Sequence, residues 1–148
     1  MKKKDIRPAL DALKPIKLQK IEDKAFRGRI VKTHVALVAA KNQLEADQKA
    51  LEEAHLGAYE KEREEVSQLQ QDLQAETDVK RQKELLREIN GHKELFAAIR
   101  EYNKAYEKFL GEDVPEIPLL KQKEFIDAIV EKQDLDLGAI EALYPLFG

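Results

Sequence analysis

Apolar residues recur every seven positions along the middle of the chain. They begin at residue 30, and smaller side chains stand three positions further on. The heptad positions are Ile30, Leu37, Leu44 and Leu51. This spacing predicts a long helix, from about residue 22 to residue 56, that packs lengthwise against another helix. Between Val35 and Ala40 the helix is apolar almost all round, which predicts burial on more than one side.

A second apolar stripe predicts the helix that returns along the first one. It runs from about residue 78 to residue 110 at alternating spacings of four and three. We expect the heptad positions to pack against residues of this arm, namely Leu85, Phe96, Ile99 and Tyr106. Tyr102, Tyr106 and Phe109 form an aromatic ladder, for which core packing is the default interpretation. Asn90 and Gly91 are a turn signal inside the arm and predict a kink there.

The chain must reverse between the two stripes, and two segments are candidates. The first candidate is 57–65, where Gly57 can end a helix and residues 60–65 contain no apolar side chain. The second candidate is 74–78, where Thr77 or Asp78 can cap a new helix. We favour 74–78. Residues 22–110 are thus predicted to form an antiparallel helical hairpin, a coiled-coil-like stalk.

The two ends of the chain predict a small head. A short helix over 5–13 is stopped by Pro15, and 16–21 alternates as an edge strand or an extended lead-in would. Two prolines keep 114–120 extended, and short helices follow over 123–130 and 136–144. We therefore predict a mainly α single domain over 1–148. Its head is built from 1–21 and 111–148, with room for a short two-stranded ribbon.

The composition narrows the function classes. The chain has 148 residues, 37% of them charged, and no cysteine, so disulfides, thiol catalysis and thiolate metal sites are excluded. The six glycines never cluster into a phosphate-binding loop. The carboxylates fall on polar helix faces, where they stay ionised and solvated. We expect no catalytic residue, no cofactor and a protein that is not an enzyme.

The histidines are candidate metal ligands, but their spacing does not support a metal site. Glu52 and His55 have the Glu-x-x-His spacing of di-iron helical bundles. Such a site needs a second copy of this motif, and the chain contains none. His92 lies in the apolar stripe of the return arm, where a packed histidine is the expected role, and His34 is expected to be solvated. No metal ligand is predicted.

Charge is distributed unevenly along the chain. Residues 1–32 carry eleven Lys and Arg against four acids, whereas the rest of the chain is acidic. Four cations at the start of the long helix are the candidate partner contacts: Lys24, Arg27, Arg29 and Lys32. The same basic region could instead contact nucleic acid phosphates. That alternative is weaker, because Phe26 is the only aromatic residue there for base stacking.

Three stretches resemble a family of small uncharacterised helical proteins encoded by tailed phages and prophages. They are ALDALKPIKL at 9–18, YNKAYEKFLGEDVPEIP at 102–118 and LDLGAIEALYPLF at 135–147. The resemblance implies a phage or prophage protein made in the bacterial cytoplasm, with no catalytic residues to carry over. The expected function is structural: self-association as a homo-oligomer, or docking to another phage protein such as a virion assembly component. No apolar stretch approaches the roughly 18 residues of a membrane span, so no membrane partner is expected.

Overall fold

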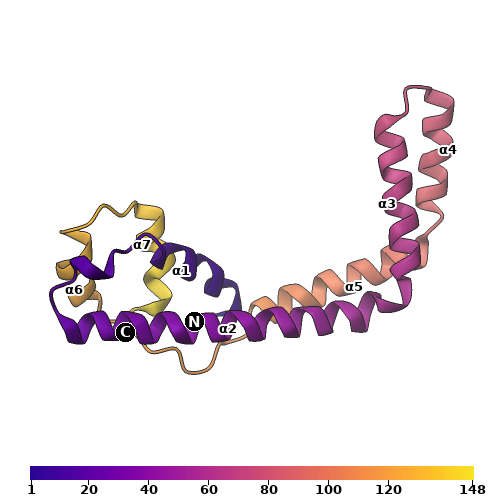
Figure 1. Cartoon of the computed structure of the whole chain (residues 1–148). Coiled ribbons are helices and arrows are strands. Elements are labelled where there is room, and N and C mark those ends of the chain that lie inside the picture. The colour runs from indigo at the N-terminus through magenta and orange to yellow at the C-terminus, as the bar shows by residue number, and fades with distance from the viewer. The chain divides into compact units, whose positions relative to one another are not determined.

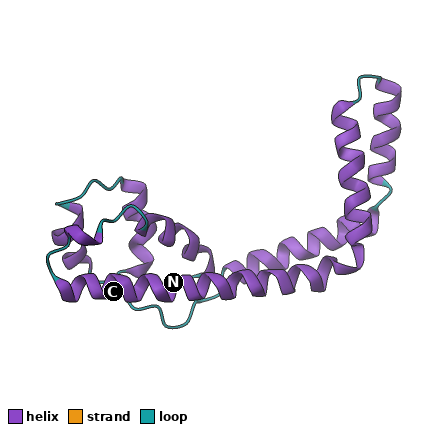
Figure 2. Ribbon diagram, viewed as in Figure 1, coloured by secondary structure: helices purple, strands orange, loops and turns teal.

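The structure, a computed structural model, describes residues 1–148 and is built of helices without any strand (Figures 1 and 2). The mainly α fold with a helical hairpin is confirmed. The α-helices are α1 (Ile6–Leu13), α2 (Lys24–Leu56), α3 (Glu60–Ala75), α4 (Val79–Asn90), α5 (Lys93–Leu110), α6 (Gln122–Phe125) and α7 (Leu137–Leu143). A π-helical turn over Ile126–Val130 follows α6.

The chain divides into two compact units. Residues 1–46 and 108–148 form one, here the terminal unit, and residues 47–107 form the other, here the hairpin unit. The predicted boundaries at residues 22 and 110 therefore move. The reason is that the first half of α2 buries Phe26, Ile30 and Leu37 within the terminal unit.

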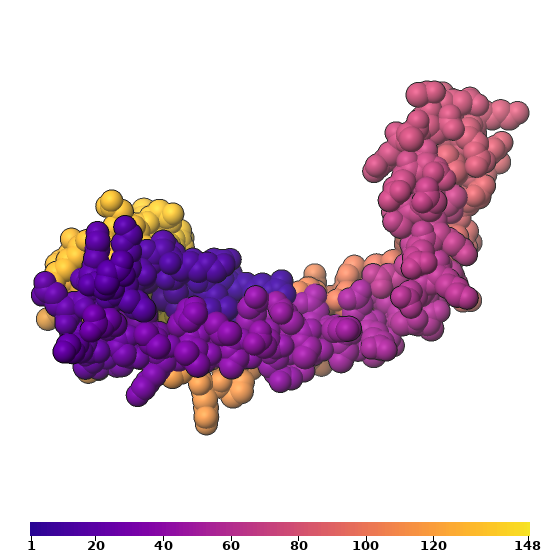
Figure 3. Space-filling view, in the orientation of Figure 1, coloured from indigo at the N-terminus to yellow at the C-terminus, as the bar shows by residue number.

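The terminal unit joins the two ends of the chain. Helix α1 packs against α7, so N-terminal and C-terminal residues lie side by side (Figure 3). Phe125 is fully buried, and its ring centroid lies 5.2 Å from that of Phe147. Thr33 is also fully buried, and its hydroxyl donates a hydrogen bond of 2.8 Å to the carbonyl of Pro118. Helix α2 is thereby tied to the loop that precedes α6. The prediction that 114–120 is extended is wrong at Glu116, whose φ is 50°.

The two-stranded ribbon allowed by the sequence is absent, and isolated bridges stand in its place. Lys2 pairs with Asp113 in an antiparallel bridge, and Leu120 pairs with Phe147 in a parallel one. Pro115 and Pro118 lie between these bridges and supply no N–H donor, so a continuous ladder cannot form. Residues 16–21 are not a strand either. A 3-10 turn over Leu18–Lys20 holds this segment.

The hairpin unit reverses where the sequence favoured it. Helix α3 ends at Ala75 and α4 begins at Val79. Asp78 caps α4 by accepting a hydrogen bond of 3.1 Å from the amide of Lys80. The carboxylate of Glu76 accepts from the amides of Thr77 and Asp78, which closes the turn. The other candidate segment holds only a 3-10 turn, Gly57–Tyr59, between α2 and α3.

A small core holds the hairpin unit together. Val66, Ile89 and Leu95 are buried in one cluster. The partly buried side chains packed against this cluster are Tyr59, Leu69, Leu73, Phe96 and Ile99. The predicted break at Asn90–Gly91 is present, since α4 ends at Asn90 and α5 starts at Lys93. Beside it, Nδ1 of His92 lies 3.2 Å from a carboxylate oxygen of Glu62.

The predicted single seam is wrong in its pairing. Leu85 lies on α4, which packs against α3, while Phe96 and Ile99 pack on the cluster around Val66. The breaks at Gly57 and Gly91 explain the difference, because they let α3 and α4 form a helix pair of their own. Of the heptad residues, Ile30, Leu37 and Leu44 are buried and belong to the terminal unit, whereas Leu51 is half-buried in the hairpin unit. Tyr106 is half-buried, and its ring stacks on that of Tyr102.

Candidate interaction surface

Three valines of α2 are exposed in a row on one face of the helix. The exposed fractions are 42% for Val31, 61% for Val35 and 38% for Val38. The expected burial of this stretch on more than one side is therefore wrong. The terminal unit covers only the face that carries Phe26, Ile30 and Leu37. Each helical residue turns by about 100°, so the valines point away from that buried face.

These valines belong to a second heptad on α2. Gly28, Val31, Val35, Val38 and Asn42 follow one another at spacings of three, four, three and four. Alternating spacings of three and four are the pattern of a helix face that packs along another helix. Valine is also a poorer helix former than Ala, Lys or Glu, the residues that usually fill exposed helix positions. We call the surface formed by these five residues the α2 face.

Cations border the α2 face. Arg27 and Lys41 stand along one side of it, with the imidazole of His34 midway between them at seven-residue intervals, and Lys32 stands on the other side. Lys32 and His34 are exposed, and Arg27 and Lys41 are half-buried. Between residues 24 and 44 there are five Lys and Arg and no acid. The surface is therefore an apolar stripe with a basic border.

A groove between α1 and α2 lies beside the α2 face and is also lined by basic side chains. Helix α1 contributes Arg7, Leu10, Asp11 and Lys14, and α2 contributes His34, Val38, Lys41, Asn42 and Glu45. Both acids of the groove already have basic neighbours. Glu45 lies 3.7 Å from Arg7 and 3.6 Å from Lys41. A hydrogen bond from Lys14 lowers the pKa of Asp11 and keeps it ionised. The groove holds three Lys and Arg against two acids, so it is weakly basic.

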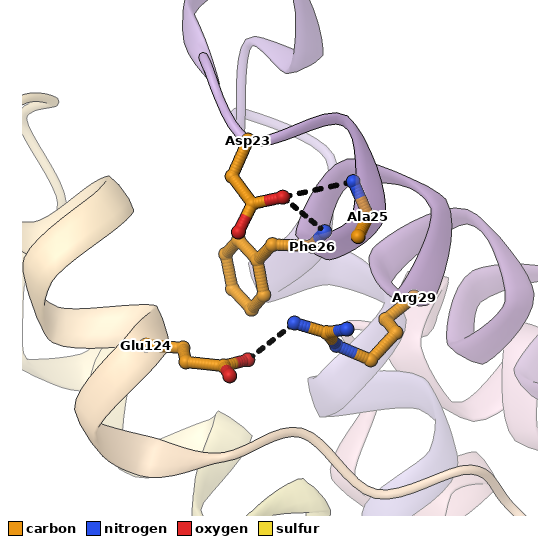
Figure 4. A network of polar contacts seen from close by, with 5 residues as sticks. All are labelled: Asp23, Ala25, Phe26, Arg29 and Glu124. Atoms are coloured by element: carbon orange, nitrogen blue, oxygen red, sulfur yellow. Dashed lines mark hydrogen bonds and ion pairs between the residues drawn. The ribbon is translucent and has the colours of Figure 1, made fainter.

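The four cations predicted as partner contacts have different surroundings. Lys24 and Lys32 are exposed, as expected. Arg29 is engaged within the terminal unit: its guanidinium lies 2.6 Å from Glu124 and 5.7 Å from the ring centroid of Phe26 (Figure 4). Arg27 is half-buried, and its Nη1 lies 3.5 Å from the carbonyl of Ile21. Arg29 is therefore a structural residue, and the free part of the set is Lys24 and Lys32.

Asp23 fixes where α2 begins and hence where its faces point. One carboxylate oxygen accepts hydrogen bonds from the amides of Ala25, at 2.9 Å, and Phe26, at 3.1 Å (Figure 4). This is the contact of an N-cap residue, which satisfies amides that have no partner inside the helix. With Phe26 only 1% exposed, the first turn is anchored in the core.

The residues considered for metal chemistry have structural partners. Glu52 lies 2.9 Å from Nη2 of Arg63. The ring of His55 packs edge-on against Tyr102, with centroids 6.3 Å apart. Nowhere do three His, Cys, Asp or Glu side chains come together as a metal site would require.

No protein family, curated protein or solved structure matches this chain at a significant level of similarity. Among its helices, none combines the length and the apolar character that crossing a membrane requires.

Proposed function

We propose that this protein is a non-enzymatic interaction protein that binds a partner helix along the α2 face. The observation that carries the proposal is the row of exposed valines at Val31, Val35 and Val38, spaced as a helix contact. A contiguous apolar surface rimmed by polar residues is typical of a protein contact site. The α1–α2 groove beside it widens the area available to a partner.

The resemblance of the chain ends to small phage proteins supports a context for this role. In that context the protein is made in the bacterial cytoplasm, and its partner is another phage protein, such as a virion assembly component. A nucleic-acid role is the second candidate, favoured by the five cations and no acids of residues 24–44. The two candidates differ in whether the valines are needed.

A neutral helical peptide tests the proposed function. The probe is a peptide of three heptads with Leu at the contact positions and Gln at the flanking positions, used where light scattering shows it to be monomeric. Added to the full-length protein, it should shift the backbone amide NMR signals of residues 28–42. Val35→Ser should weaken binding about tenfold, because a buried valine contributes about 1.5 kcal/mol or more.

The matched control is Val79→Ser, which changes a valine of α4 that is 63% exposed. This control should leave the affinity unchanged. Shifts that spread over the whole chain, or equal affinity for wild type and Val35→Ser, would contradict a contact through the α2 face.

A further inference from the structure

We infer that the partner of the α2 face is an acidic amphipathic helix of another protein, with Asp or Glu at seven-residue intervals beside its apolar stripe. This inference rests on the proposed function and adds the chemistry of the partner. It follows from the charges that border the valines.

The seven-residue spacing of the basic border matches the repeat of a helix that packs along it. Arg27, His34 and Lys41 are separated by seven residues, which is the repeat of the flanking positions in paired helices. Such flanking positions commonly hold opposite charges on the two helices and set partner choice and orientation. A partner that matches this border places a carboxylate opposite each of the three residues: two of them face the charges of Arg27 and Lys41, and the third can accept a hydrogen bond from the imidazole N–H of His34. The groove on the same side also holds Arg7 and Lys14, each beside an acid, Glu45 and Asp11 respectively.

The same charges disfavour a second copy of this chain on the α2 face. Both borders of the stripe carry cations, with Arg27 and Lys41 on one side and Lys32 on the other. Whether two copies lay parallel or antiparallel, their borders would bring Lys and Arg of one copy opposite Lys, Arg or alanine of the other, and Glu45 at the end of the face already lies beside Arg7 and Lys41. Like charges across a helix pair are destabilising and act against the wrong partner. An acidic partner turns each of these contacts into an attraction.

The valines also separate a protein partner from nucleic acid. A phosphate backbone would cover the centre of the surface with charge and leave Val31, Val35 and Val38 without apolar contacts. The one aromatic side chain in this basic region, Phe26, is 1% exposed and is not available to stack on a base. A polypeptide that is apolar in the centre and acidic at its edges satisfies both features of the surface.

The test compares peptides that differ only at their flanking positions. Three peptides carry the same Leu stripe with Glu, Gln or Lys flanks, and a fourth carries Glu flanks with Ser in place of Leu. A short DNA duplex is the fifth probe. With the full-length protein at low salt, we expect the Glu peptide to bind about tenfold more tightly than the Lys peptide. The difference should shrink at high salt, because exposed charges are screened.

Charge variants locate the effect on the chain. Lys41→Gln should reduce the advantage of the Glu peptide over the Gln peptide. Lys80→Gln, a change of an exposed lysine on α4, should not. Both variants remove one charge, so an effect of total charge alone would appear in both.

The outcomes distinguish a failure of the acidic-partner inference from a failure of the proposed contact through the α2 face. Equal binding of the Glu and Gln peptides would overturn the acidic partner and leave the contact through the α2 face standing. Failure of all three Leu peptides would remove the proposed function itself. If the Ser peptide or the duplex binds as tightly as the Glu peptide, and Val35→Ser has no effect, the surface is a polyanion site and both proposals are wrong.

Discussion

Phe125→Ala should lower the free energy of unfolding of the terminal unit by about 3–5 kcal/mol. Phe125 is fully buried, and its ring packs against that of Phe147. Truncation to alanine removes this contact and leaves a cavity that rigid neighbours fill only in part. Since small domains are typically stable by about 5–15 kcal/mol, the change would leave the terminal unit marginally folded.

Denaturant unfolding combined with amide hydrogen exchange measures this effect. Protection should fall for α1 and α7, which pack together in the terminal unit, and far less for α3 and α4. The control is Leu119→Ala, at a residue that is 55% exposed, and it should cost about 1 kcal/mol or less. If Phe125→Ala costs no more than this control, the described core of the terminal unit is wrong.

Leu95→Ala should open the hairpin unit, with a loss of about 2–5 kcal/mol. Leu95 is 1% exposed and forms a buried cluster with Val66 and Ile89, while Leu56 and Leu85 are the other buried leucines of this unit. Because the cluster is small, the loss of one of its three buried members removes a large share of the apolar contacts. Helices α3 and α4 should then fray, since helices of their length are marginal without tertiary packing.

Hydrogen exchange resolved along α3 and α4 checks this prediction. Leu86→Ala is the matched control, because Leu86 lies on α4 and is 45% exposed. Exchange in α3 and α4 should accelerate strongly in Leu95→Ala and hardly change in Leu86→Ala. Equal acceleration in both variants would show that the cluster around Val66 does not hold the unit together.

Local signals in the sequence predicted the elements well. The capping candidates Thr77 and Asp78 predicted the reversal within 74–78, and Asn90–Gly91 predicted the break in the return arm. Pro115 and Pro118 kept helix out of their segment, but the segment is not extended throughout, because Glu116 between them has a φ of 50°. In each case the determining interaction lies within a few residues, so it can be read from the sequence.

The pairing of elements was not predictable from the same patterns. Periodicity identifies the apolar face of a helix but not the segment that covers it. Leu37 was assigned to a stalk seam, whereas the structure buries it in the terminal unit. Arg29 was assigned to a partner, although it pairs with Glu124, 95 residues away. Such contacts depend on how distant segments of the chain pack together. The spacing of residues within one helix carries no information about that packing.

The exposure of the α2 face was also not predictable from the periodicity of the sequence. The sequence contains its signal, a second heptad through Val31, Val35 and Val38. The apolar character of Val35 to Ala40 almost all round the helix predicts burial on more than one side, but it does not separate a face covered by the chain from a face open to a partner. In the structure only one of these faces is covered, so the other is open for a partner.

The solution mass of the full-length protein tests most directly whether the α2 face is open in the isolated chain. Light scattering over a hundredfold range of concentration, at low and at high salt, is the measurement. The account predicts a monomer of 17.0 kDa throughout, because the basic borders of two copies repel each other. A stable dimer that Val35→Ser dissociates would contradict it, since the α2 face would then be covered by a second copy.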